Sequence, residues 1–413
     1  MTNLKLTNKP TLQILILDDE PFILSLLEHM LTRLGFNHLT SYDKGKRAIA
    51  SLNSSSRHPD LILLDLNMPE MDGIEFVRHL VGKSYSGSII LVSGEDVRMM
   101  QAVERLVIAH KITILGYLQK PINLEELSTL IDRWEPASYV RPPLAKKIYG
   151  ANDVLAAINN HELVNYYQPK VNVTSGKVIG VETLVRWRHP KDGMVFPDQF
   201  INVAEDHGLI DDLTRVVMNE AFPQTRIWRD AGLCLRVALN ISMENLDSLE
   251  FADYVTTAAA KAGLVPDDIV LEVTESRLMK NSSTSLEILA RLRLKGFHLS
   301  IDDFGTGHSS LTQLRDLPFN ELKVDQGFVH GAASNETLRS IYNASLSLAQ
   351  QLGMKSVAEG IEDRADWDFI NSSTCDLAQG YFIAKPMPAD ELHDWIIKWE
   401  ANIENLITPS DKS

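Results

Sequence analysis

The chain has 413 residues, which is too long for one small hydrophobic core, so two domains are expected. Its hydrophobic content of 44% and charged content of 23% are ordinary for a globular protein. The net charge of −15 argues against sequence-independent binding to nucleic acid or to a membrane surface, because both need a basic field.

The cysteines and the hydropathy pattern indicate where the chain works. Cys234 and Cys375 lack the spacing of metal ligands and are expected to be buried small apolar residues in a reducing compartment. No apolar run approaches the roughly 18 residues of a membrane span, and no signal pattern opens the chain. We therefore expect a cytoplasmic protein without membrane insertion.

The first half of the chain alternates short apolar runs with amphipathic segments. Apolar runs of strand length occupy 12–17, 61–64, 88–92 and 112–118, and helical spacing of apolar residues occurs over 22–34 and 124–134. This alternation predicts a doubly wound, flavodoxin-like α/β domain over residues 10–135. Prolines then predict a linker over 136–150.

The second half, residues 151–400, continues the alternation for longer. Its predicted strands end near residues 168, 186, 240, 275, 303, 325, 359 and 381, each followed by helix-like sequence. Eight such units over about 250 residues are typical of a TIM-like βα barrel, whose active site lies where the strands finish. Residues 401–413 are expected to form a disordered tail.

One of these strands runs directly into Asp302 and Asp303 and then into a glycine-containing loop that reaches Ser310. Two adjacent carboxylates at a strand end repel each other unless a cation neutralises them. Their hard oxygen ligands favour Mg²⁺ or Mn²⁺. Taken alone the pair is weak evidence, because a double aspartate before a glycine loop is often a solvated turn.

Other predicted strand ends supply partners for this pair. One metal could take Glu182, Asn240, Glu272 and Asp302, and a second could take Asp303, Asp325 and Glu359. Two metals suit the hydrolysis of a phosphodiester. Lys323 could orient the attacking water or donate to the leaving oxygen, and Glu359 could act as a base, so both join Glu182 as catalytic candidates. Arg186 shares a strand face with Glu182 and could bind a phosphate through its bidentate fork.

A second acidic group follows the strands of the first domain. Asp18 and Asp19 close its first strand and Asp65 its third, while Ser93 and Lys120 follow later strands. These positions converge on one edge of a parallel sheet. Three carboxylates could hold Mg²⁺ there while one of them accepts a phosphoryl group, and the hydroxyl and the ammonium could bind the transferred oxygens.

The order and spacing of these residues resemble the receiver domain of bacterial response regulators. The resemblance rests on Asp18-Asp19, on Asp65 within residues 64–73, on Ser93-Gly94 and on residues 116–121. It implies that Asp65 is the phospho-acceptor for a cognate sensor histidine kinase. It also implies one Mg²⁺ or Mn²⁺ at Asp18, Asp19 and the Asn67 carbonyl, and a switch formed by Ser93, Tyr117 and Lys120. The alternative is an inert receiver that serves only for docking.

The motifs of the second half resemble the EAL-domain family of phosphodiesterases. The matching segments are Gln168-Pro169, 182–187, Asn240, 272–275, 302–307, 323–325, Glu359-Gly360 and 379–381. The resemblance implies hydrolysis of cyclic di-GMP to linear pGpG with two Mg²⁺ or Mn²⁺ ions. It implies that Gln168, Arg186 and Gln379 bind substrate. It further implies that Glu275 anchors the 302–310 loop, and that this loop belongs to a homo-oligomer contact. A receiver followed by an EAL domain would form a two-component response regulator.

Two positions depart from the EAL family pattern. The family's Glu-Ala-Leu is Glu182-Thr183-Leu184 here, and strand alternation places Thr183 on the face opposite Glu182. The usual tyrosine of the loop is replaced by His308, which could bring a pH-dependent contact but is more simply a surface substitution.

Two alternatives to a regulated enzyme stay open. The second domain could be a catalytically weak effector that binds cyclic di-GMP, or the chain could be an interaction protein whose partner responds to phosphorylation of Asp65. Our working hypothesis is that phosphorylation repacks Ser93 and Tyr117 and biases the 302–310 loop. No Gly-Lys-Ser/Thr follows residues 305–307, so a nucleotide-binding P-loop is not predicted.

Overall fold

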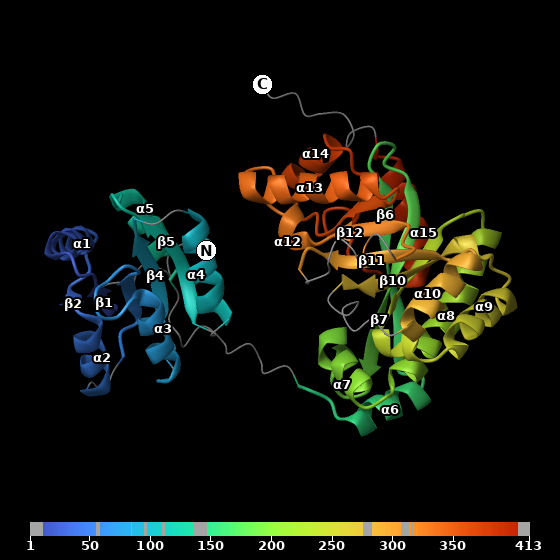
Figure 1. Cartoon of the computed structure of the whole chain (residues 1–413), viewed down its shortest axis with the longest axis horizontal. Coiled ribbons are helices and arrows are strands. Elements are labelled where there is room, and N and C mark those ends of the chain that lie inside the picture. The colour runs from blue at the N-terminus through green and yellow to red at the C-terminus, as the bar shows by residue number, and fades with distance from the viewer. Residues whose placement is uncertain are drawn as a thin grey trace. The chain divides into compact units, whose positions relative to one another are not determined.

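The computed structural model describes residues 11–54, 58–83, 85–94, 97–109, 112–134, 147–275, 283–306, 314 and 317–403. The chain forms two compact units, Met1–Ala145 and Lys146–Ser413 (Figure 1). Among the helices in these described residues, none has the length and hydrophobicity needed to cross a membrane.

Within its described residues, the first unit is a five-stranded parallel sheet with helices on both faces. Its strands are β1 (Gln13–Leu17), β2 (His38–Tyr42), β3 (Leu61–Asp65), β4 (Ser88–Ser93) and β5 (Thr113–Gln119). Its helices are α1 (Pro21–Arg33), α2 (Gly45–Ser54), α3 (Gly73–Val81), α4 (Val97–Ala109) and α5 (Leu124–Asp132). The strand order β2-β1-β3-β4-β5 confirms the doubly wound, flavodoxin-like prediction.

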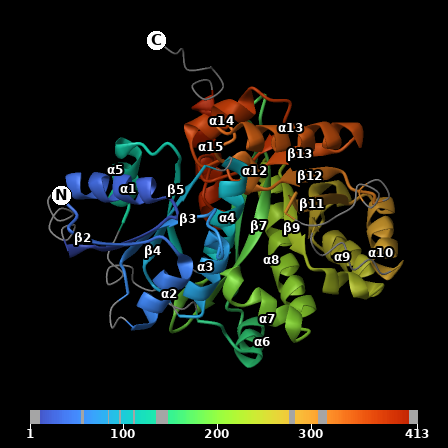
Figure 2. The ribbon, with the colours of Figure 1, turned by 60° about the vertical axis from the view of Figure 1, so that its left-hand side comes forward.

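Two separate apolar clusters hold the helices against this sheet. The strands β3 and β4 are buried along their whole length, as expected for central parallel strands. One cluster joins the sheet to α2, α3 and α4, and the other joins it to α1 and α5. Figure 2 shows these helix layers on opposite sides of the strands. Asp18, Asp65 and Lys120 lie at the carboxyl ends of β1, β3 and β5.

The sequence predicted most elements of this unit. The helices predicted over 22–34 and 124–134 correspond to α1 and α5, and the four predicted strands correspond to β1, β3, β4 and β5. The count of strands left a place for β2, but no apolar run marked its residues, because its sequence is mostly polar. Its place at the edge of the sheet explains that composition, since no residue of β2 is fully buried.

The second unit contains more strands and a ring of covering helices. Its strands are β6 (Leu163–Asn172), β7 (Val178–His189), β8 (Gly193–Val195), β9 (Arg236–Ile241), β10 (Ile269–Thr274), β11 (His298–Phe304), β12 (Glu321–Val324), β13 (Lys355–Ala358) and β14 (Leu377–Ala378). Its helices are α6 (Ala151–Asn159), α7 (Ile201–Asp206), α8 (Ile210–Asp230), α9 (Glu250–Lys261), α10 (Ser283–Leu294), α12 (Gln326–Val329), α13 (Glu336–Gln351), α14 (Arg364–Asn371) and α15 (Ala389–Glu400). Short 3-10 turns are η2 (Pro197–Gln199), η3 (Met243–Asp247) and η4 (Pro266–Asp268).

Strands β7, β9, β10, β11, β12, β13 and β14 follow one another in parallel around a barrel. Strand β6 closes the ring, because it pairs antiparallel with both β14 and β7. Within the described residues, β8 pairs with β7 outside this ring. The TIM-like barrel is therefore confirmed, with one strand reversed relative to the eight-fold parallel form.

The prediction that every barrel strand is followed by a helix is wrong for the first strand. Strand β6 runs past Gln168 and forms an antiparallel hairpin with β7 through a turn at 173–177. Strand β7 runs past Arg186 because its last residues pair with β8. Gly176 takes a φ of 65° in this turn, a conformation that favours glycine. The other predicted strand ends lie close to the ends that the structure shows.

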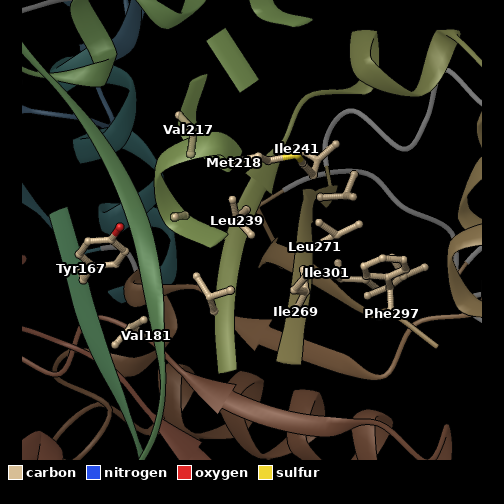
Figure 3. Close-up of a cluster of buried hydrophobic side chains, with 14 of the residues drawn as sticks. Tyr167, Val181, Val217, Met218, Leu239, Ile241, Ile269, Leu271, Phe297 and Ile301 are labelled. Carbon is tan, nitrogen blue, oxygen red and sulfur yellow. The ribbon is translucent and has the colours of Figure 1, made fainter. Parts of the chain in front are cut away.

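Alternation along the parallel strands separates an apolar outer face from a polar inner face. The outward residues, which pack against α8 and its neighbours (Figure 3), include Leu239, Leu271 and Ile301. Each of these three side chains is at most 1% exposed. Their sequence neighbours Asn240, Glu272 and Asp302 therefore point into the barrel.

Candidate active site

Inward side chains of neighbouring strands meet because the strands are in register. Gln168 lies opposite Glu182, and Asn240 lies opposite Glu272. Asn240 Nδ2 donates to Glu182 Oε1 at 2.8 Å, and Gln379 Nε2 donates to Glu182 Oε2 at 2.6 Å. Gln379 Nε2 also donates to Gln168 Oε1 at 3.0 Å. Amide donors thus hold both oxygens of Glu182.

Lys323 lies at the centre of the carboxylates and is only 1% exposed. Its Nζ is 2.8 Å from Glu272 Oε2, 2.8 Å from Glu359 Oε1, 2.9 Å from Asp302 Oδ1 and 3.6 Å from Glu182 Oε2. One ammonium cannot neutralise this many carboxylates. The site therefore keeps a net negative charge that a bound cation would offset.

Two groups of carboxylate oxygens have the spacing of divalent metal ligands. Glu182, Glu272 and Asp302 each offer an oxygen, and these atoms lie within 4.8 Å of one another. Asp302, Asp303 and Glu359 form a second such group. The structure thus brings these predicted ligands together, with Asp302 common to both groups. Hard oxygen donors of this kind suit Mg²⁺ or Mn²⁺.

The two remaining predicted ligands lie beside these groups. Asn240 is bonded to Glu182, as described above. Asp325 caps the N-terminus of α12, where its Oδ1 accepts a hydrogen bond from Gly327 N at 2.8 Å. Asp325 also lines the same cavity as Asp303. It is therefore near the second group, with one oxygen engaged by the helix.

The carboxylates differ in how readily they ionise. Burial raises the pKa of Glu182 and of Glu359, and the nearby Lys323 offsets only part of this effect. Burial, together with Asp302 and other carboxylates nearby, raises the pKa of Asp303 to about 6. A proton therefore competes with a cation for Asp303 near pH 6.

Glu272 behaves in the opposite way. Burial would raise its pKa, but Lys170 and Lys323 lower it to about 2. Burial also disfavours the charge of Lys323, yet the surrounding carboxylates raise its pKa. Lys170 was not singled out in the sequence. The available signal was a lysine two residues after Gln168, on the same face of β6.

The loop after β11 begins with an unusual backbone. Asp303 has a φ of 55°, which is uncommon for a residue other than glycine. Gly305 N then donates to Glu275 Oε2 at 2.7 Å, and Glu275 is only 2% exposed. Glu275 therefore holds the start of the loop, where the resemblance placed an anchor. Residues 307–313, including His308, lie outside the described residues.

A polar cavity of about 270 Å³ opens on this cluster. Its lining includes Gln168, Glu182, Asp303, Asp325, Glu359 and Gln379. Tyr381 also lines it and is 60% exposed, so its ring offers a stacking surface. A second, more apolar cavity of about 470 Å³ lies beside β7, α7 and α8 and includes Thr183 and Asn240. Thr183 thus faces a different cavity from Glu182.

Arg186 lies on β7 between two aromatic rings. Its guanidinium carbon is 5.8 Å from the centroid of Tyr166 and 5.2 Å from that of Phe196. Its Nη1 donates to the Val185 carbonyl at 2.9 Å. These contacts fix the guanidinium plane, which pre-orders it for a planar, bidentate anion.

The first unit gathers its own acidic group at the carboxyl ends of β1 and β3. Asp18, Asp19 and Asp65 offer oxygens within 4.8 Å of one another. Lys120 Nζ is 3.0 Å from Asp18 Oδ2 and 3.4 Å from Asp65 Oδ2. Burial, with Asp18 nearby, raises the pKa of Asp65. Asn67 is exposed beside Asp65, and its N–H donates to Asp65 Oδ1 at 3.4 Å.

The predicted switch residues lie on β4, the strand next to Asp65, and on and after β5, the strand beyond it. Ser93 is fully buried at the end of β4, one position after Val92, which pairs with Asp65. Tyr117 lies on β5 and is partly buried. The Lys120 N–H donates to the Ser93 carbonyl at 2.9 Å, so Ser93 and Lys120 are directly linked.

Comparison with family models matches both units. The EAL domain model matches residues 151–386, and the response regulator receiver domain model matches residues 14–132. The chain belongs to the EAL domain family. It carries a receiver domain before the EAL domain, as response regulators do.

Some relatives match this chain along almost its whole length, and others match only about the length of its EAL domain. The cyclic di-GMP phosphodiesterase RocR of Pseudomonas aeruginosa is 34% identical over 93% of this chain and 98% of its own length. The bifunctional diguanylate cyclase/cyclic di-GMP phosphodiesterase MucR of the same organism is 42% identical, over 58% of this chain and 35% of its length. A solved structure, the PaMucR phosphodiesterase in complex with c-di-GMP, has a TM-score of 0.56 and 40% identity, covering 58% of this chain and 98% of that one.

Proposed function

We propose that the chain is a response regulator that hydrolyses cyclic di-GMP to linear pGpG. The observation that carries this proposal is the group of carboxylates around Lys323 at the open end of the barrel. The names of the relatives support the substrate, since RocR and MucR are cyclic di-GMP phosphodiesterases. RocR also supports the whole-chain organisation, because it matches along almost its full length.

The proposed cofactors are two Mg²⁺ or Mn²⁺ ions. The residues that would hold them are Glu182, Asn240, Glu272 and Asp302 for one, and Asp303, Asp325 and Glu359 for the other. When bound, these ions would supply an activated water and stabilise charge on the phosphoryl group. The donor set fits them, because it combines hard oxygens with a surplus of negative charge.

The protein's own residues would then bind and orient the diester. Arg186 would hold a phosphate through its fork. Lys323, whose pKa is raised, stays protonated and so would donate to the attacking water or to the leaving oxygen. Glu359, whose pKa is also raised, would accept the proton of the water. The water oxygen bonds to phosphorus, the bond from phosphorus to the 3′ oxygen breaks, and a proton passes to that oxygen.

The amides and the cavities would place the rest of the substrate. Gln168 and Gln379 contact each other and Glu182, so they would orient this ligand as well as contact substrate. The two cavities suit two purine bases, because one offers the exposed ring of Tyr381 and the other an apolar wall.

The receiver would supply regulation. Asp65 would accept a phosphoryl group from a sensor histidine kinase, with a divalent cation at Asp18, Asp19 and the Asn67 carbonyl. Lys120, which reaches Asp65, would bind a transferred oxygen. We further propose that the protein acts in the cytoplasm and associates with a second copy through its EAL domain.

Glu182→Gln tests the catalytic proposal. The substitution removes one ligand charge, so kcat for cyclic di-GMP should fall by about a hundredfold or more, because several kcal/mol of charge stabilisation depend on the metals. Turnover would be measured by pGpG formation with Mg²⁺ and with Mn²⁺, and binding would be measured separately by calorimetry. Glu391→Gln, the same change at an exposed position of α15, is the matched control.

If the wild-type protein binds cyclic di-GMP but forms no pGpG with either metal, the proposal that the chain is a phosphodiesterase is refuted. That result would leave the chain as a binding effector. Equal rates for Glu182→Gln and wild type would instead show that the site lies elsewhere.

A further inference from the structure

Lys170 is a buried cation beneath the proposed active site. It lies on β6 and is only 4% exposed. Within the part of the chain that the structure describes, it does not line the polar cavity. Burying an ammonium is costly unless partners compensate it. The partners of Lys170 therefore indicate why the barrel keeps it.

Two carboxylates from other strands surround the ammonium of Lys170. Its Nζ is 2.5 Å from Glu272 Oε1 and 3.4 Å from Glu321 Oε1. Glu321 Oε1 also accepts a hydrogen bond from Ser300 Oγ at 3.1 Å. Burial opposes the charge of Lys170, but the two carboxylates outweigh it and raise the pKa. Lys170 is thus held in its charged form inside the barrel.

Glu272 is consequently held from two sides. Its Oε1 accepts from Lys170, while its Oε2 is 2.8 Å from Lys323 Nζ. Lys323 Nζ also contacts Asp302, so Oε2 is the oxygen on the side of the proposed metal ligands. The side chain of Glu272 is fully buried, so the two ammoniums rather than water set its orientation.

We propose that Lys170 is a positioning residue that engages Glu272 Oε1, so that Glu272 presents only Oε2 to the metal in the first ligand group. This inference rests on the proposed function, because it assumes that Glu272 is a ligand. Partners that orient a metal ligand commonly change metal affinity by about 10–100-fold when removed. Lys170 reaches the metal only through Glu272, so it should affect metal binding rather than substrate binding.

Lys170 and Glu321 together carry no net charge, which allows a clean test. Lys170→Met with Glu321→Gln removes both charges, leaves no unpaired charge in this layer, and keeps a group that can accept from Ser300. Any change in metal affinity then reflects the orientation of Glu272 and not the net charge. Glu321→Gln alone retains the contact between Lys170 and Glu272 and is the matched control.

The experiment measures Mn²⁺ binding to the full chain by calorimetry, without substrate, beside the melting temperature and steady-state kinetics. A receiver variant, Asp65→Asn, removes the acceptor carboxylate at the other cation site and serves as the common background. The double variant should bind Mn²⁺ about tenfold more weakly, and the control within about twofold of the background protein. At saturating Mn²⁺ the KM for cyclic di-GMP should be unchanged.

Lys170→Gln, in the presence of Glu321→Gln, supplies a neutral donor and should recover part of the lost affinity. If the variant with Lys170→Met fails to fold, the variant with Lys170→Gln and Glu321→Gln can still be compared with Glu321→Gln alone. Mn²⁺ affinity that is unchanged or tighter in a folded double variant would overturn the proposal. Loss of Mn²⁺ affinity in the double variant, together with a background protein that forms no pGpG, would refute the proposed reaction and leave the positioning role intact.

Discussion

Asp303 is a proposed metal ligand whose carboxyl should titrate near neutral pH in the metal-free protein. Burial and neighbouring carboxylates raise its pKa to about 6, from an ordinary value of 3.8. Between these two values the folded state binds the extra proton, so ionisation of Asp303 destabilises the metal-free fold as pH rises. A bound cation removes that penalty. Mn²⁺ should therefore raise the melting temperature more at pH 7.5 than at pH 5.5.

Asp303→Asn is the control for this pH effect. It has no carboxyl to titrate, so the increase in melting temperature caused by Mn²⁺ should be smaller and should depend less on pH. The measurement is thermal unfolding with and without Mn²⁺ at both pH values. This account would be contradicted if Mn²⁺ raised the melting temperature of the wild type as much at pH 5.5 as at pH 7.5.

Arg186 should contribute to substrate binding more than to the chemical step. Its guanidinium is pre-ordered between Tyr166 and Phe196 and lies on the strand that carries Glu182. Charge-assisted hydrogen bonds are worth about 1.5–3 kcal/mol each, so Arg186→Met should raise the KM for cyclic di-GMP by about 10–100-fold. Arg188→Met is the control, because Arg188 lies on the same strand but is exposed. Equal KM values for the two variants would exclude a phosphate contact at Arg186.

At the scale of elements, strand ends were predictable and strand direction was not. Apolar runs that finish in Asn240, Glu272 or Asp302 identify both the strand and its inward side chains, because alternation has a fixed period. The same alternation along β6 reads equally well in either direction. Only the turn around Gly176 signalled a hairpin. The pairing of β6 with β14, which is distant in sequence, then closes the barrel.

The contacts inside the barrel could not be predicted for a related reason. Lys323 and the carboxylates come from strands that are far apart in the sequence, and only closure of the ring makes them neighbours. Lys170 was missed because its partners lie on β10 and β12, which are distant from β6 in the sequence. Residue types at strand ends therefore predicted the composition of the site, but not its ion pairs.

The loop after β11 depends on close approach at Gly305. This residue has a φ of 99°, and a Cβ there would lie 2.6 Å from a ring carbon of Phe328 on α12. Gly305→Ala should displace the loop from Glu275 and lower kcat by about tenfold or more, because a small misplacement of catalytic groups is costly. Gly296→Ala is a matched control with a φ of 94° and a nearest contact of 3.5 Å. Both variants carry similar backbone strain, so similar activities would show that the contact with Phe328 is unimportant.

At the scale of the whole molecule, the chain enters the second unit beside the segment that follows β7, the strand that carries Arg186. Lys147 Nζ and Tyr149 Oη contact Asp192 Oδ2 at 2.7 Å and 2.9 Å, and Gln199 Nε2 donates to the Lys147 carbonyl at 3.1 Å. The neighbouring Phe196 packs on Arg186. The end of the linker is thus tied to the segment that orders a proposed phosphate ligand.

Beryllofluoride, which mimics a phosphoryl group on Asp65, tests whether the two units are coupled. Binding at Asp65 would draw Lys120 toward the new oxygens, and Lys120 is bonded to the Ser93 backbone, so a change at the acceptor is passed to β4 and β5. We expect beryllofluoride to change kcat/KM for cyclic di-GMP by more than about twofold, since allosteric couplings are typically 1–3 kcal/mol. Asp65→Asn should abolish the change. Rate and solution mass that are both unaffected by beryllofluoride in the wild type would show that the receiver does not regulate this reaction.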